Sequence, residues 1–151
     1  GDHRDLHKEY RRQRQMCIRD RIKDGNRPQF PLWLAPTQVR LIPLKDEHLE
    51  FATNLADKFI EQNIRVDIDD RNDTIGKRIR DAEKEWISYV LVIGQKEVNS
   101  PKLSIRDRTT GDVRELSIED FIKEITNATK DKPISRLNST LLLSQRPQIM
   151  V

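Results

Sequence analysis

Hydrophobic positions change their period several times along the chain, and each change predicts a new element. Ile64, Val66 and Ile68 alternate with charged residues, the period-two pattern of a strand with one face buried and the other in water. Residues 89–93 are apolar throughout, as expected of a central strand covered on both faces. Gly111 lies where a hairpin turn favours a positive φ. The predicted strands are 38–44, 64–69, 89–93, 102–108 and 112–116.

Three amphipathic helices are predicted between and after these strands, because apolar residues recur there at intervals of three and four. The first begins near Asp46, and the third is capped by Ser117. The second is capped by Asn72 or Asp73, and its apolar line leaves four basic residues toward solvent: Lys77, Arg78, Arg80 and Lys84. The apolar stripes are Ala52, Leu55, Ala56, Phe59 and Ile60, then Ile75, Ile79, Ala82 and Trp86, then Ile118, Phe121, Ile122 and Ile125.

The order of these elements predicts an α/β fold with a mixed, mostly parallel five-stranded sheet and three helices. Strands that alternate with helices form parallel units, whereas a hairpin adds antiparallel strands. We assign residues 31–130 to this one domain and residues 22–30 to a linker that leads into it. Residues 131–151 form a C-terminal tail, in which 141–143 are apolar enough to dock on the domain.

The first twenty-one residues require a separate interpretation. They are rich in Arg and lack an apolar period, which is typical of a basic RNA-binding tail. However, codons for residues 1–7 and 11–21 can be chosen that reproduce two short-read sequencing adapters, a flow-cell primer and a transposon end, in matching order and frame. Residues 8–10 fall where a sample index would lie. We therefore interpret residues 1–21 as a non-native, adapter-like segment and exclude them from the fold.

This exclusion removes the basic character of the chain. The segment holds 7 of the 28 Lys and Arg and 4 of the 25 Asp and Glu, which leaves 21 of each sign in residues 22–151. Net charge then gives no general argument for nucleic-acid binding. Cys17, the only cysteine, is excluded too, so no disulfide, thiol nucleophile or Cys/His zinc site is expected. No stretch has the ~20 apolar residues of a membrane span, so we expect a cytoplasmic protein without membrane contact.

Candidate catalytic and metal-binding residues are few. The first strand-to-helix turn, 43–47, has no glycine and carries two carboxylates, which disfavours a nucleotide-phosphate site. Asp67 and Asp69 would suit a hard metal, but strand alternation explains them better as residues of the outward face. His48 has no nucleophile in a motif beside it and is expected on the surface. Neither a metal site nor a catalytic residue is therefore predicted.

The basic residues are more informative. Within 71–80 only Asp73 opposes the basic side chains, so this stretch predicts a local positive surface, although such charges often only solvate a helix. On the strand 102–108, Leu103 and Ile105 occupy one face. The other face then carries a polar row that can read base edges or protect a sheet edge: Ser104, Arg106 and Arg108.

Several motifs together resemble the anticodon-binding domain of threonyl-tRNA synthetases. They occur in the family's order with similar spacing: WLAPTQVR at 33–40, DDRN at 69–72, IGKRIRDAE at 75–83, VLVIGQKEV at 90–98 and KLSIRDR at 102–108. The resemblance covers roughly residues 28–130. Related domains of prolyl-, glycyl- and histidyl-tRNA synthetases share some of these features, but Trp33 favours the threonyl member. The sequence of the second helix resembles that of archaeal members.

The resemblance implies which residues contact tRNA. Anticodon binding is expected at Asn72, Glu97 and Arg106, with Arg80 as a nearby backbone or base contact. Possible phosphate contacts are Lys77, Arg78 and Arg108. Threonine anticodons share a central G followed by U, so the resemblance implies a guanine clamp of Glu97 and Arg106 and a uracil contact at Asn72. Thr74 replaces a Lys that is frequent in the family, so a phosphate contact is not expected there.

The resemblance also implies what lies outside this chain. The family places its catalytic motifs and zinc ligands upstream, so we expect no cofactor in this fragment and ATP, magnesium and zinc in a missing catalytic domain. The parent is expected to be a homodimer that joins threonine to its tRNA. The alternatives are a domain of this fold from a prolyl- or glycyl-tRNA synthetase, a non-catalytic accessory or interaction module, and a small doubly wound enzyme.

Overall fold

The structure is a computed structural model that describes residues 28–134 and 139–147 of the chain. The adapter-like segment 1–21 and residues 22–27 of the predicted linker lie outside the described residues. The strands are β1 (Val39–Pro43), β2 (Val66–Ile68), β3 (Tyr89–Ile93), β4 (Lys102–Asp107) and β5 (Val113–Ser117). The helices are α2 (Leu49–Glu61), α3 (Ile75–Lys84), α4 (Gln95–Asn99) and α5 (Ile118–Ala128), with 3-10 turns η1 (Leu32–Leu34), η2 (Asp46–His48) and η3 (Leu143–Gln145).

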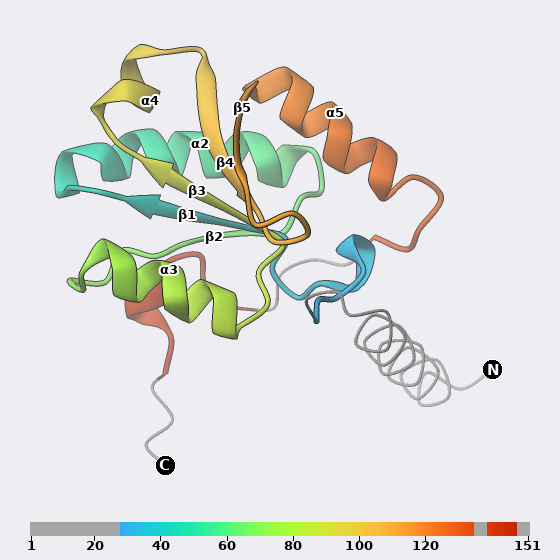
Figure 1. The fold of residues 1–151 in the computed structure, drawn as a ribbon, viewed down its shortest axis with the longest axis horizontal. Coiled ribbons are helices and arrows are strands. Elements are labelled where there is room, and N and C mark those ends of the chain that lie inside the picture. Colours follow the sequence, from blue (N-terminus) through green and yellow to red (C-terminus); the bar gives the residue numbers. More distant parts are fainter. Residues whose placement is uncertain (1–27, 135–138, 148–151) are drawn as a thin grey trace.

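The five strands form one mixed sheet in the order β2-β1-β3-β4-β5 (Figure 1). β1 pairs in parallel with both β2 and β3, whereas β4 runs antiparallel to β3 and to β5. This arrangement confirms the predicted α/β fold with a mixed five-stranded sheet. The short helix α4 was not predicted, because a five-residue helix is too short to show an apolar period.

Helices cover the two faces of the sheet unequally. On one face, α2 and α5 bury a continuous core with the alternate residues of the strands, among them Leu41, Leu91 and Ile105. On the other face, α3 packs through Ala82 onto a smaller cluster that contains Ile42 of β1 and Val90 of β3. α2 and α3 accordingly lie on opposite sides of the strands in Figure 1.

Predictions based on local patterns are largely confirmed. Gly111 has a φ of 77° in the hairpin turn, where a residue with a Cβ would be strained. The Ser117 hydroxyl accepts a hydrogen bond from the Asp120 amide and caps α5. Two residues of the predicted apolar stripes are wrong: Ile60 is 51% exposed at the end of α2, and Ile75 is 40% exposed at the start of α3.

The prediction that β2 has one face in water is wrong. Asp67 and Asp69 have no exposed surface, although they alternate with the apolar residues of the strand. The Asp67 carboxylate accepts hydrogen bonds from Arg40 at 2.9 and 3.0 Å and from Thr37 at 3.2 Å. A buried charge requires such partners. The strand is therefore covered on both faces, with charged pairs on one of them.

One capping prediction and one surface prediction are also wrong. Thr74, rather than Asn72 or Asp73, caps α3, and its hydroxyl accepts from the Lys77 amide. His48 is 4% exposed instead of lying on the surface, because the turn η2 folds it against the domain before α2 begins.

The C-terminal tail docks on the outer edge of β2. The Ile68 amide donates to the Leu141 carbonyl at 2.9 Å, and Ile68 and Leu142 form a parallel bridge. Arg146 donates to the Asp67 carboxylate at 2.9 Å. This segment covers part of an otherwise unpaired sheet edge, as the apolar residues 141–143 predicted.

Neither a membrane span nor a metal cluster occurs in the described part of the chain. Within residues 28–134 and 139–147, every helix is too short or too polar to cross a bilayer. The same residues contain no group of three or more His, Cys, Asp or Glu side chains positioned to hold a metal ion.

Candidate nucleic-acid interface

The half of the sheet formed by β4 and β5 presents its α3-side face to solvent. Val113 of β5 is 54% exposed on this face, and Arg106 of β4 is partly exposed beside it. α3 packs instead on Ile42 and Val90, nearer the other edge of the sheet. We call the uncovered surface of β4 and β5, together with the flank of α3 beside it, the open face.

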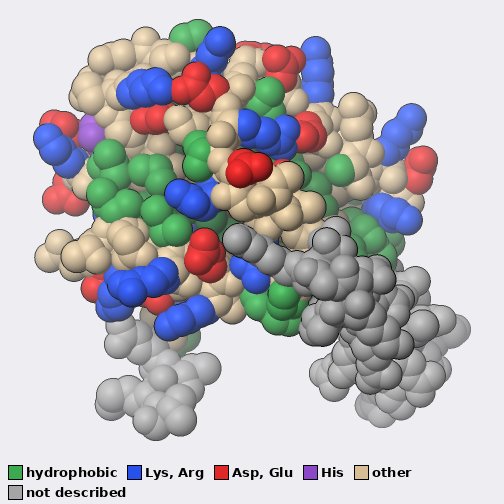
Figure 2. Space-filling model, in the orientation of Figure 1, with side chains coloured by type: hydrophobic (Ala, Val, Ile, Leu, Met, Phe, Trp, Pro, Cys, Tyr) green, Lys and Arg blue, Asp and Glu red, His purple; other side chains and the backbone are tan. Residues whose placement is uncertain are grey.

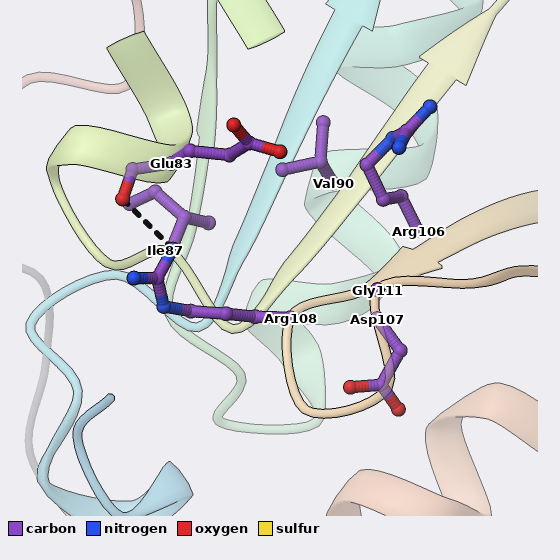
Figure 3. A pocket seen from close by; sticks show the side chains of 7 residues that line it. All are labelled: Glu83, Ile87, Val90, Arg106, Asp107, Arg108 and Gly111. Carbon is purple, nitrogen blue, oxygen red and sulfur yellow. Dashed lines mark hydrogen bonds between the residues drawn. The ribbon is translucent and has the colours of Figure 1, made fainter. Parts of the chain in front are cut away.

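Arg106 lies in the middle of the open face. It pairs in register with Val90 of β3 on one side and with Val113 of β5 on the other. Figure 3 shows its side chain directed along β3 toward the carboxyl end of that strand, away from Arg108 and Asp107. Among the described residues its guanidinium has no hydrogen-bond or ion-pair partner, so its donors are available to a ligand.

Glu97 lies at the end of the open face where β3 leads into α4. One of its carboxylate oxygens accepts from the Gly94 amide at 3.0 Å, which caps α4, and the other accepts from the Ser104 hydroxyl at 2.9 Å. Ser104 precedes Arg106 by two residues and therefore shares its face of β4. Glu97 is only 8% exposed, so its carboxylate is held in a fixed position next to the arginine face.

Asn72 and Arg80 are exposed on the side of α3. Asn72 lies in the turn between β2 and α3, at the carboxyl edge of the parallel strands, as Glu97 does. Arg80 follows Gly76 by one turn and precedes Glu83, which lines a shallow pocket with Arg106 and Val90. Arg80 itself is exposed to solvent, and its Nε donates to the Gly76 carbonyl at 3.3 Å.

The predicted phosphate contacts have different surroundings. Lys77 is exposed, and its ammonium pairs with Asp73 at 2.9 Å. Arg78 was predicted to face solvent, which is wrong: it is 5% exposed and donates to the carbonyls of Pro43 and Asp69 at 2.9 and 3.1 Å. Its guanidinium binds the carboxyl ends of β1 and β2 because the sheet-facing stripe of α3 includes position 78. The structure therefore does not support a surface phosphate contact by Arg78.

Arg108 also uses its guanidinium within the domain. It donates to the Pro28 carbonyl at 2.9 Å and to the Glu83 carbonyl at 2.8 Å, the second of which is drawn in Figure 3. Phe30 packs against Trp86 close by, with ring centroids 5.2 Å apart and the rings tilted by 53°. Arg108 therefore fastens the chain before β1 to the end of α3, and a phosphate contact by this residue stays a prediction.

An ion pair crosses the open face beside Glu97. Lys96 of α4 binds Glu115 of β5, the register partner of Ser104. The hydrogen bond and the charge of each partner raise the pKa of Lys96 and lower the pKa of Glu115. The two side chains are 69% and 48% exposed, so solvent screens their attraction, and the pair shapes this end of the open face more than it stabilises the fold.

Comparison with known proteins identifies the family. The model of the family described as "Anticodon binding domain" matches residues 38–128, which is more than half of the chain. This chain belongs to the anticodon-binding domain family. The expected family resemblance is thereby confirmed, and the matched residues span all five strands and α2 to α5.

Archaeal threonine–tRNA ligases are among the relatives of this chain. This anticodon-binding domain is 62% identical to the enzyme of Nitrosopumilus maritimus over 87% of the chain, and 47% identical to that of Methanosphaera stadtmanae over 81%. The chain spans only about a fifth of the length of these relatives, 21% and 20% respectively.

Solved structures agree with the fold. The RNA-binding domain of threonyl-tRNA synthetase from Cryptosporidium parvum superimposes with a TM-score of 0.62 at 25% identity, covering 74% of this chain and 27% of that chain. Prolyl-tRNA synthetase from the same organism gives a TM-score of 0.59 at 20% identity, covering 66% of this chain and 23% of that chain, and shares the fold alone.

The anticodon-binding domain brings some predicted residues together and separates others. Glu97 and Arg106 share one side of the sheet through Ser104, and Asn72 lies on the same carboxyl edge as Glu97. The role of Ser104 as the residue that holds Glu97 was missed. Its alternation with Leu103 and Ile105 placed Ser104 on the correct face, but no local pattern indicated a hydrogen bond to Glu97, seven positions earlier in the chain.

Proposed function

We propose that this domain reads the anticodon of threonine tRNA as part of a threonine–tRNA ligase. The observation that carries the proposal is the guanidinium of Arg106 on the open face, which has no partner among the described residues and lies on the same face as the fixed Glu97 carboxylate. Specific RNA recognition targets the exposed edges of unstacked loop bases, which require this kind of fixed donor and acceptor. Relatives that carry the name threonine–tRNA ligase at 47–62% identity support the choice of substrate.

The chemistry of the proposed contacts fits the threonine anticodon. An arginine can donate two hydrogen bonds to O6 and N7 of guanine, and each such pair contributes roughly 1–3 kcal/mol of discrimination. A carboxylate has about four acceptor sites. Glu97 uses two of them, for Gly94 and Ser104, and so keeps acceptors for donors of the central guanine. Asn72 is exposed and carries both a donor and an acceptor, which suits uracil. Arg80 is proposed as an adjacent contact.

The activity of the parent enzyme is part of the same proposal. We propose that the parent joins threonine to its tRNA with ATP, magnesium and a catalytic zinc held outside this chain. We also propose that it is a cytoplasmic homodimer. These features follow from the family resemblance and from the names of the relatives, of which this chain represents about a fifth.

Binding to isolated anticodon stem-loops tests the proposal. The 151-residue chain is titrated, at one stated salt concentration, with a threonine stem-loop and with the same loop carrying adenine in place of the central guanine. We expect at least tenfold tighter binding of the matched loop, since one bidentate contact provides about that discrimination. Equal affinity for the two loops would refute the guanine clamp.

Variants then assign the discrimination to residues. Arg106→Ala is expected to weaken the matched loop and to abolish the preference for guanine. Lys77→Ala is expected to weaken both loops by the same factor, as for a contact with phosphate alone. Arg114→Ala is the matched control, because Arg114 projects from the neighbouring strand β5 but pairs with Glu124 at 2.7 Å, away from the open face.

A further inference from the structure

Two exposed aliphatic side chains lie between the residues proposed to read the anticodon. Leu44, directly after β1, is 37% exposed, and Ile75, the first residue of α3, is 40% exposed. Both are at the carboxyl edge of the parallel strands, as are Asn72 and Glu97. Figure 2 shows hydrophobic side chains gathered at the surface between α4 and α3. Exposed apolar groups rimmed by polar ones are typical of binding sites.

Leu44 is in direct contact with the turn that carries Glu97. A Cβ placed on Gly94 would lie 2.8 Å from Cδ1 of Leu44 and 3.4 Å from Oε2 of Glu97. The leucine side chain and the glutamate carboxylate therefore pack around the same glycine. In doubly wound proteins, ligands occupy the crevice between the carboxyl ends of strands at which the strand order reverses. Here Leu44 fills that position between β1 and β3.

Ile75 extends this apolar surface toward Asn72. The first turns of α3 lie over the end of β1, because Arg78 donates to the Pro43 carbonyl at 2.9 Å. Ile75 lies one turn before Arg78 on the same side of the helix. Asn72 precedes Ile75 by three residues, in the turn that leads into the helix. Along this edge Asn72 follows β2, Leu44 follows β1 and Glu97 follows β3, and Ile75 begins the helix that Arg78 binds to the end of β1.

Aromatic residues do not supply a stacking surface here. Among the described residues, Phe59 and Tyr89 both pack edge-on against Phe121 in the core, Phe51 of α2 packs against the same core, and Phe30 packs on Trp86. Trp33 lies under Lys132, 5.6 Å from its ammonium. A base taken out of a loop needs an apolar surface for its face as well as partners for its edge.

We propose that Leu44 and Ile75 form an aliphatic platform that supports the face of an anticodon base, while Asn72 or Glu97 contacts its edge. The platform rests on the proposed function and extends it, since it contributes affinity for any base and no discrimination between bases. Exposed aliphatic groups between the reading residues allow the base to leave the loop stack without losing all of its apolar contact.

The test compares Leu44→Ser and Ile75→Ser with the unchanged chain in the same stem-loop titrations. We expect each variant to bind about three- to tenfold more weakly, as fits the loss of apolar contact with a base. The ratio of affinities for the guanine and adenine loops should stay unchanged. Ile60→Ser is the matched control, because Ile60 is 51% exposed at the end of α2, which leads into the amino end of β2, and the readers lie at the carboxyl edge of the parallel strands. Ile75→Thr keeps the β-branched shape and is measured in its place if Ile75→Ser does not fold.

A stem-loop without a base gives the decisive readout. An abasic nucleotide is placed at the second or the third anticodon position, and the effect of Ile75→Ser is measured again. We expect the effect to disappear with one of the two abasic loops, which identifies the base on the platform. The proposal is overturned if Leu44→Ser and Ile75→Ser bind as the unchanged chain does, or if the effect persists with both abasic loops. Loss of the guanine preference in the unchanged chain would instead overturn the proposed function.

Discussion

Arg146 links the C-terminal tail to a buried carboxylate of the sheet, and its removal should destabilise the domain. Its guanidinium donates to Asp67 at 2.9 Å and to the Thr140 carbonyl at 3.1 Å, while the Asp67 side chain has no exposed surface. A hydrogen bond to a charged group contributes about 1.5–3 kcal/mol. Arg40 still neutralises Asp67 in an Arg146→Ala variant, through two hydrogen bonds of 2.9 and 3.0 Å. The lower part of that range, about 1.5–2 kcal/mol, is therefore expected.

Thermal unfolding and amide exchange measure this effect at two levels. A loss of about 1.5–2 kcal/mol lowers the unfolding midpoint of a domain of this size by roughly 5–10 °C. The local readout is the Ile68 amide, which donates to the Leu141 carbonyl and should exchange faster once the tail is released. Arg146→Lys keeps the charge, so its unfolding midpoint should lie between those of the unchanged chain and of Arg146→Ala. An unchanged midpoint together with an unchanged exchange rate at Ile68 would show that the tail is not held by Arg146.

Three further outcomes test the structure. Arg78→Ala should lower the free energy of unfolding in urea by about 2–4 kcal/mol, because two carbonyls lose a charged donor. Burial alone would raise the pKa of Asp69, but hydrogen bonds from Arg71 lower it overall. The stabilisation from the ionised Asp69 is therefore present above the unfolded pKa of about 4 and is lost as pH falls through the lower folded pKa. In urea unfolding between pH 2 and 6, the free energy of unfolding should therefore fall less steeply with acid in Arg71→Met than in the unchanged chain. Gly94→Ala should displace Leu44 and weaken stem-loop binding in the titration, while stability in urea changes by about 1 kcal/mol or less.

The elements that local chemistry determines were predictable from the sequence. The strand at 89–93 is apolar on both faces, and Gly111 and Ser117 mark a turn and a helix start through their own backbone and hydroxyl groups. Each of these signals depends on a few neighbouring residues. For such segments the period of hydrophobic residues and the capping residue decide the element without knowledge of the rest of the chain.

The second face of β2 was not predictable in the same way. Alternation shows which residues share a face, but it cannot show whether that face is covered. Asp67 is buried by Arg40 of the neighbouring strand and by Arg146, which lies 79 residues away in the sequence. Arg78 was mistaken for a surface residue for the same reason, since its partners are the carbonyls at the ends of two other strands.

The candidate site was only partly accessible to sequence reasoning. The family resemblance supplied Glu97 and Arg106, and strand alternation placed Arg106 with Ser104. The short helix α4, which fixes Glu97 through its own capping hydrogen bond, has too few residues to be predicted from a period. The exposed positions of Leu44 and Ile75 depend on how α3 lies over β1, which is a property of packing.

The topology of the sheet explains why the open face exists. Each parallel pair requires a crossover helix, and the two crossovers place α2 and α3 on opposite faces. The antiparallel strands β4 and β5 need no crossover: β3 joins β4 through the short α4, and β4 joins β5 through the hairpin at Gly111. The one helix that follows, α5, returns to the face already covered by α2. Within residues 28–134 and 139–147, no helix is therefore left to cover the α3-side face of β4 and β5, so the Arg106 guanidinium stays accessible while its strand is held in the sheet.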